Sequence, residues 1–147
     1  MTALLMSDED LVDGFERATL AAAQFTHAQH VRTAWLFLRR DGLPRALDTF
    51  PAALRQFAIA NGAPQLYHAT ITWAYLLLIH ERQQLCHAEQ WPDFAAAHRD
   101  LLTWKPSILD DYYTPATLWS EFARQTFVMP DRGIRDRSHE PALAERS

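Results

Sequence analysis

Residues 67–79 read YHATITWAYLLLI, and this stretch decides the fold of the chain. The run from Ile71 to Ile79 is apolar on nearly every side of a helical wheel, which is typical of a helix buried in a protein core. The next segment, HERQQLCHAEQ at residues 80–90, is polar, so we expect the helix to emerge into solvent there. β-Branched residues at the start would also fit a short strand, but no partner strand is evident elsewhere in the chain. A central helix from Tyr67 or His68 to Cys86 or His87 is therefore predicted.

Upstream of this stretch, capping residues and glycines predict the ends of three further helices. The first begins after Ser7 and should end near residue 24. The second begins after Thr26 and ends before Gly42, with apolar residues recurring at helical spacing between them. The third has a proline near its first turn and stops at the Asn-Gly pair of residues 61–62. Because Pro51 lies inside that third pattern, a kink or a break is expected there.

Downstream, a shorter helix should start at Pro92, and Thr114 should cap a last helix that ends at Pro130. That last helix carries Leu118, Trp119, Phe122 and Phe127, and Trp119 is expected to lie in the core. Residues 132–147 are charged and lack aromatic residues, which predicts a flexible tail. The chain is thus predicted to be all-α, a compact bundle of about five or six helices forming a single domain over residues 1–131.

Composition and charge exclude several classes of function. The formal net charge is −4 and the cations are scattered, so a nucleic-acid-binding surface is not expected. The longest strongly apolar run is far too short to span a bilayer, so no membrane association is expected either. Cys86 is the only cysteine, which excludes an internal disulfide and fits a reducing compartment. The first residues lack the pattern of a signal peptide, so a cytoplasmic location is predicted.

Several motifs together resemble a group of small bacterial proteins of unassigned function. The first is F-x-H-x-x-H-V-R-x-A-W, present as FTHAQHVRTAW, and the second is Y-H-x-T-I-T, present as YHATIT. YYTPATL and ARQTFVMPD near the C-terminal end match the same group. The resemblance covers nearly all of residues 25–131 and implies a recurrent helical fold without supplying an activity. Similar proteins often carry an acid after the Y-H pair, where this chain has Ala69.

Three histidines stand at positions where apolar residues would be usual in such helices. His27 falls on the apolar stripe of its helix, and His30 lies at the edge of that stripe. His68 lies at the start of the central helix and also faces inward. Three imidazoles and a water would suit a divalent metal such as zinc or iron, so His27, His30 and His68 are the candidate metal ligands. The same residues could instead be structural histidines that are satisfied by backbone and hydroxyl partners.

Three neighbours complete the candidate ligand-binding site, namely Tyr67, Thr72 and Trp73. In one alternative a single histidine acts as an acid or base and is oriented by one of these neighbours. The chain would then be a small-molecule-binding protein or an enzyme whose reaction the sequence does not name. In the other alternative it is a non-catalytic helical module that binds another protein through an exposed apolar surface. Arg32 is expected at the surface. Arg124 is expected to form a structural ion pair with Asp131, Asp110 or Asp111.

Overall fold

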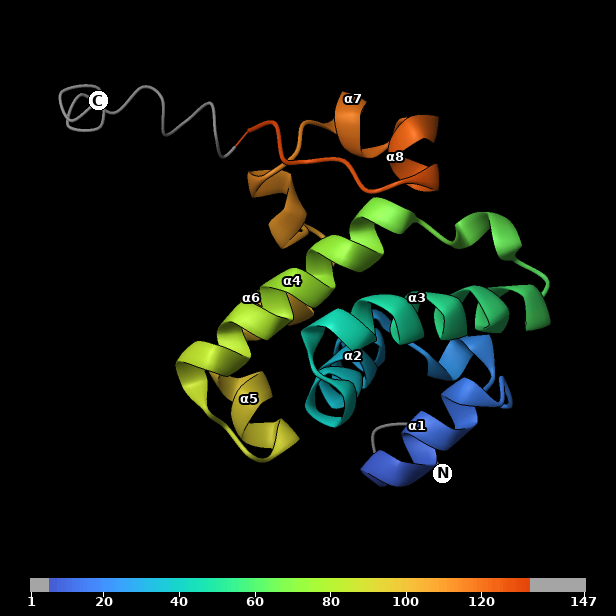
Figure 1. Cartoon of the computed structure of the whole chain (residues 1–147), viewed down its shortest axis with the longest axis vertical. Helices are drawn as coiled ribbons and strands as arrows, with labels where there is room; N and C mark the ends of the chain where they lie inside the picture. Colours follow the sequence, from blue (N-terminus) through green and yellow to red (C-terminus); the bar gives the residue numbers. More distant parts are fainter. Residues whose placement is uncertain (1–5, 133–147) are drawn as a thin grey trace, which may run out of the picture.

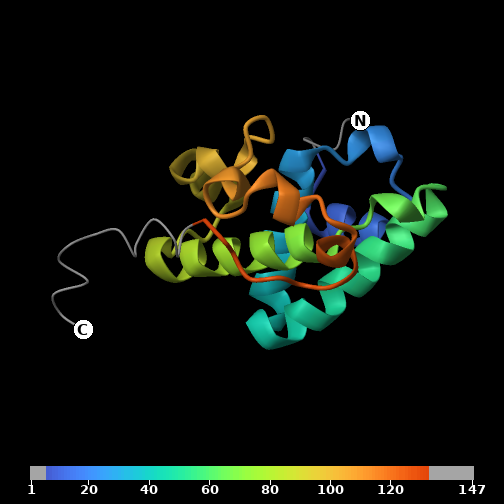
Figure 2. The same cartoon turned by 90° about the horizontal axis from the view of Figure 1, so that it is seen from above.

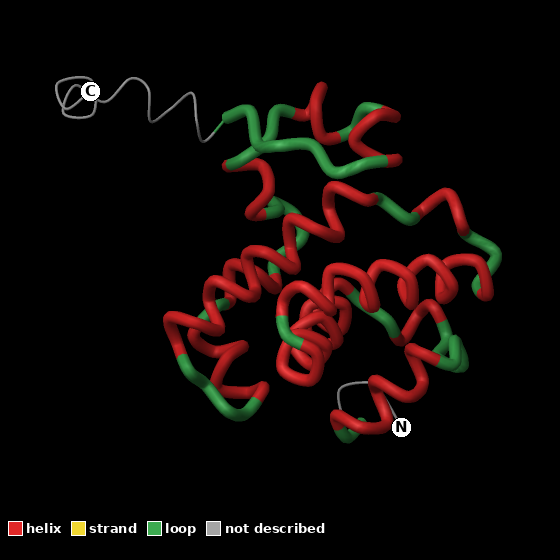
Figure 3. Tube along the Cα trace, in the orientation of Figure 1, coloured by secondary structure: helices red, strands yellow, loops and turns green. Residues whose placement is uncertain are grey.

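The computed structural model describes residues 6–132, and over that range the chain consists of helices and loops alone (Figure 3). The α-helices are α1 (Asp8–Glu16), α2 (His27–Asp41), α3 (Leu43–Ala60), α4 (Ala69–Cys86), α5 (Trp91–Ala97), α6 (Arg99–Leu102), α7 (Pro115–Leu118) and α8 (Glu121–Gln125). Short 3-10 helices connect some of them: η2 (Ala22–Gln24), η3 (Pro64–Leu66) and η4 (Ile108–Asp111). The all-α prediction is confirmed. The tail predicted for residues 132–147 lies, apart from Arg132, outside the described residues.

Helices α2, α3 and α4 pack against one another and form the centre of the molecule (Figure 1). Leu76 and Ile79 of α4 are fully buried, as expected of the apolar run that decides the fold. Farther along the same helix Leu85 is 75% exposed, because it lies in the polar second half of α4. The prediction of a central helix that emerges at its polar end is confirmed. None of the described helices combines the length and the apolar character that crossing a bilayer requires.

The ends of the central helices are set by local chemistry that the sequence displays. The Thr26 hydroxyl accepts a hydrogen bond from the Gln29 amide at the start of α2, and Gly42 ends that helix with a φ of 80°. Helix α3 continues through Pro51, so the break expected there does not occur. A proline inside a helix removes one backbone hydrogen bond, and Pro51 is buried in the packed interior of the bundle.

The first helix is shorter than predicted. It ends at Glu16, and Ala18 takes a left-handed conformation with a φ of 57° that turns the chain back on itself. This turn folds Leu20 onto Gly14, where an added Cβ would lie only 3.0 Å from the Leu20 Cγ atom. Helical periodicity alone could not predict that the chain reverses direction here, because the contact between Gly14 and Leu20 depends on the turn at Ala18.

The predicted last helix is also divided. Ser120 accepts a hydrogen bond from the Ala123 amide and thereby caps a separate helix, α8, after α7 has ended at Leu118. Trp119 is 54% exposed, so the prediction that it lies in the core is wrong, and Phe122 is 68% exposed. Both short helices lie beside the start of α4, as Figures 1 and 2 show, and the Thr70 hydroxyl of α4 donates to the Thr126 carbonyl just after α8.

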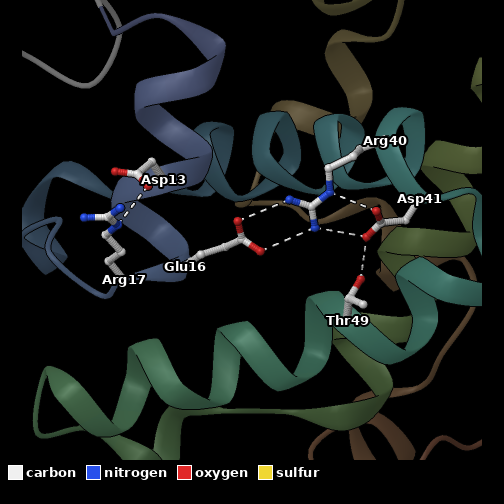
Figure 4. A network of polar contacts seen from close by, with 6 residues as sticks. All are labelled: Asp13, Glu16, Arg17, Arg40, Asp41 and Thr49. Atoms are coloured by element: carbon white, nitrogen blue, oxygen red, sulfur yellow. Dashed lines mark hydrogen bonds and ion pairs between the residues drawn. The ribbon is translucent and has the colours of Figure 1, made fainter.

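Ionic contacts fasten the first three helices to one another. The Arg40 guanidinium bridges the carboxylates of Glu16 and Asp41, and the Asp41 carboxylate also accepts a hydrogen bond from the Thr49 hydroxyl (Figure 4). Arg32 does not lie at the surface as expected. It is 7% exposed, because the start of α1 covers it and Asp8 accepts a hydrogen bond from its Nη2 atom at 2.9 Å.

Candidate functional site

A cavity of about 530 Å³ lies between α2, α3, α4 and the short segments that connect and follow them. Most of its wall is apolar. The aliphatic and aromatic side chains that line it come chiefly from the central helices and include Phe25, Val31, Ala34, Phe50, Phe57, Ile71 and Ile79. Ordinary protein interiors leave few voids larger than a water molecule, and ligand pockets typically measure about 300–1,000 Å³. Its volume and lining therefore match those of a small-molecule site.

All three histidines identified in the sequence line this cavity. They reach it from two helix starts, because α2 begins at His27 and His68 is the N-cap of α4. Helical phase alone does not place the starts of two helices relative to each other. The packing of α2 against α4 brings both starts to the same cavity.

His27 is fixed by a hydrogen bond and two aromatic neighbours. Its Nε2 atom lies 2.9 Å from the carbonyl oxygen of Leu101 in α6, seventy-four positions along the chain. The rings of Tyr75 and Trp104 lie with their centroids 5.0 Å from the imidazole, the former edge-on. Burial lowers the pKa of His27, and the carbonyl of Leu101 partly opposes that shift.

His30 is half-buried, because its imidazole faces the cavity while protein surrounds it on the other sides. The Phe25 ring lies 4.0 Å away between centroids. The pKa of His30 is lowered to about 4, chiefly by burial and also by the charge of nearby His27, while a hydrogen bond to the backbone of Phe25 acts in the opposite direction. The side chain is consequently a neutral imidazole near pH 7, able to donate one hydrogen bond and accept another.

His68 is 5% exposed and has partners for both ring nitrogens. Its Nδ1 atom accepts a hydrogen bond from the Ile71 amide at 3.1 Å and so caps α4. Its Nε2 atom lies 2.7 Å from the Leu118 carbonyl oxygen, which requires the proton on that nitrogen. Burial lowers the pKa of His68, and the charge of Arg124 lowers it as well. Ile71, Leu118 and Arg124 therefore hold His68 in one neutral tautomer, with the proton on Nε2.

The three candidate neighbours of the histidines differ in position. Tyr67 and Thr72 line the cavity. The Arg55 guanidinium stacks over the Tyr67 ring at 4.6 Å, and the Thr72 hydroxyl donates to the His68 carbonyl oxygen. Trp73 is not part of the cavity wall, because one residue farther along α4 turns its side chain to another face, where it packs on Phe127.

The histidines share a cavity without forming the expected ligand set for a metal. Within residues 6–132 no three His, Cys, Asp or Glu side chains are grouped so that they could hold a metal ion. The hydrogen bonds of His68 give the physical reason, since neither of its ring nitrogens keeps a lone pair directed at the cavity. A zinc or iron site built from His27, His30 and His68 would require His68 to give up the cap of α4.

Sequence reasoning missed other residues of the cavity wall. Tyr75 and Trp104 line it beside His27, and Arg124 lines it beside His68. The expected pairing of Arg124 with Asp131 is wrong, because Asp131 instead binds Thr114 and Thr117. Helical phase could have identified Tyr75, which lies seven positions after His68 on the same stripe of α4. No sequence signal could identify Arg124 or Trp104, since they reach the cavity from short segments placed only by tertiary packing.

Comparisons with known proteins supply no further guide to this cavity: no family model, no curated protein and no solved structure matches the chain.

Proposed function

We propose that this chain is a binding protein for a small, mostly apolar molecule that occupies the cavity between α2, α3 and α4. The observation that supports it is the cavity itself, about 530 Å³ with an apolar wall and a few convergent polar groups. The neutral imidazoles of His27 and His30 supply the polar contacts that would orient such a ligand. A metal is not required for this function.

The alternative expected from the sequence is a helical module that binds another protein, and it would need an exposed apolar surface. Among the described residues, the large apolar side chains that are more than half exposed are Leu66, Leu85, Trp119, Phe122 and Met129. Access to the cavity accounts for Leu66 and Trp119, which line it, whereas the other three lie outside its wall. The size and the apolar wall of the cavity favour a small-molecule ligand over a protein partner.

The test is to fill the cavity and to measure binding of a neutral apolar dye. Phenylnaphthylamine fluoresces when it leaves water, and its fluorescence should rise on titration into the wild-type protein. Ala34 is buried in the cavity wall, so Ala34→Leu should place a larger side chain in the ligand space and reduce dye binding about tenfold or more. The protein should keep its stability, because the added methyl groups enter open space.

The matched control is Ala46→Leu. Ala46 is fully buried on α3 but does not line the cavity. Overpacking there should lower the free energy of unfolding by about 1–3 kcal/mol while leaving dye binding unchanged. Equal dye binding by the wild type and Ala34→Leu, or no dye binding by the wild type, would overturn the proposed function.

A further inference from the structure

The cavity has an exposed end and a closed end. Leu66 and Trp119 line it and are 72% and 54% exposed, so the opening lies between η3 and the segment that joins α7 to α8. Val31 and Ile79 line it as well, and they are 2% and 0% exposed. A ligand that enters at η3 therefore meets an apolar floor formed by α2 and α4.

Arg124 is the one residue of the cavity wall with a permanent charge, and no acidic residue of the described chain shares that wall. Its Nη1 atom donates to the Gln65 carbonyl oxygen, which fixes the guanidinium beside η3. Its Nε atom lies 3.7 Å from a carboxylate oxygen of Glu121, a side chain that is 71% exposed and outside the wall. Such an exposed, long ion pair contributes little, so it leaves most of the Arg124 charge available to a ligand.

The guanidinium stands close to the inner wall as well as to the opening. Its charge reaches His68, whose Nε2 atom is occupied by Leu118. Within residues 6–132 the Nη2 atom of Arg124 has no hydrogen-bond acceptor. Its N–H groups match the planar, two-oxygen geometry of a carboxylate.

We propose that the ligand is an amphipathic monocarboxylate whose carboxylate binds Arg124 at the opening and whose apolar body extends toward Val31 and Ile79. This inference rests on the proposed function and adds the chemical class of the ligand. A single anionic charge matches the single cation of the wall. The imidazoles of His27 and His30, which also line the cavity, are neutral near pH 7 and would not compensate an anion placed beside them. A ligand of this class therefore binds with its charged end outward.

The experiment compares decanoate with decanol as competitors of phenylnaphthylamine at pH 7.5, below the concentration at which decanoate forms micelles. The two molecules share an apolar chain and differ in the head group. Arg124→Gln should weaken decanoate roughly tenfold or more and change decanol less than twofold. Arg17→Gln is the matched control, because it removes the same charge from an exposed residue of the first turn after α1 and should leave both competitors unchanged.

Arg124→Lys keeps the charge and loses the planar arrangement of donors, so its affinity for decanoate should lie between those of wild type and Arg124→Gln. Decanol binding serves as the check that α8 remains in place in each variant. Equal losses for decanoate and decanol, or the same loss of decanoate in Arg17→Gln, would overturn the assignment of the head group and leave the proposed function standing. Failure of the dye and of decanol to bind wild type would overturn both.

Discussion

The Nε2 atom of His68 lies 2.7 Å from the carbonyl oxygen of Leu118, fifty positions farther along the chain. This bond joins the first residue before α4 to the last residue of α7, and it lies in the wall of the cavity. The same imidazole caps α4 through its other nitrogen. His68 thus holds two segments together at the place where a ligand would enter.

His68→Ala should lower the free energy of unfolding by about 2–3 kcal/mol. The substitution removes a helix cap, worth about 1 kcal/mol, and leaves a buried carbonyl oxygen without its donor. His68→Asn restores the cap but cannot span the distance to Leu118, so about half of that loss should remain. Urea denaturation followed by far-ultraviolet circular dichroism measures both values. An unchanged midpoint for His68→Ala would show that this histidine has no structural role.

Stability should fall in mild acid because of His30. Burial lowers its pKa from 6.5 to about 4 in the folded protein, so the unfolded chain binds the proton more tightly. The contribution of His30 to the free energy of unfolding is therefore fully present above about pH 6.5. It is lost as the pH falls toward 4, which lowers the free energy of unfolding by about 3 kcal/mol for a shift of this size. His27 and His68 act in the same direction, since burial lowers the pKa of each.

His30→Gln tests this assignment, because glutamine keeps a polar side chain and does not titrate. Its free energy of unfolding should vary distinctly less between pH 6.5 and 4 than that of the wild type, with a residual slope from the other two histidines. Denaturation curves recorded at half-unit pH intervals give the comparison. Parallel pH profiles for the two proteins would contradict the pKa assigned to His30.

Arg40→Lys should lower the free energy of unfolding by about 0.5–1 kcal/mol, a modest amount because the Arg40 side chain is 45% exposed. Lysine retains the charge but cannot reach Glu16 and Asp41 together with paired donors. Arg17→Lys is the matched control, since Arg17 contacts only the exposed Asp13 in the same view (Figure 4). That control should change stability by a few tenths of a kcal/mol at most, and an equal loss in both variants would argue against the bridging role of Arg40.

Asp131 should govern the local stability of α7. Its carboxylate accepts hydrogen bonds from the Thr114 amide, the Thr114 hydroxyl and the Thr117 hydroxyl, each at 2.8 Å. These bonds lower the pKa of Asp131, so their contribution is present at neutral pH and is lost in strong acid. Asp131→Asn should speed hydrogen exchange at the amides of residues 114–118, as measured by mass spectrometry. Asp111→Asn, on an exposed neighbour, should leave the exchange of that segment unchanged.

The sequence by itself determined the elements whose causes are local. The apolar run from Ile71 to Ile79 has one stable environment, the interior of a helical bundle, and Thr26 and Gly42 mark the ends of α2 by their own side-chain and backbone chemistry. Helical phase also placed His27 and His68 on inward faces, because one turn of a helix fixes which residues share a side. These inferences do not depend on which helices pack against each inward face.

Only the tertiary structure decided what those inward faces meet. The cavity depends on contacts between residues far apart in the sequence. The same is true of the hydrogen bond between His68 and Leu118 and of the position of Arg124 at the opening. The predicted last helix is divided in the structure, and the end of α7 is joined across the bundle to His68, which bonds the Leu118 carbonyl oxygen. The candidate site is therefore a product of packing, built around histidines that the sequence alone could identify.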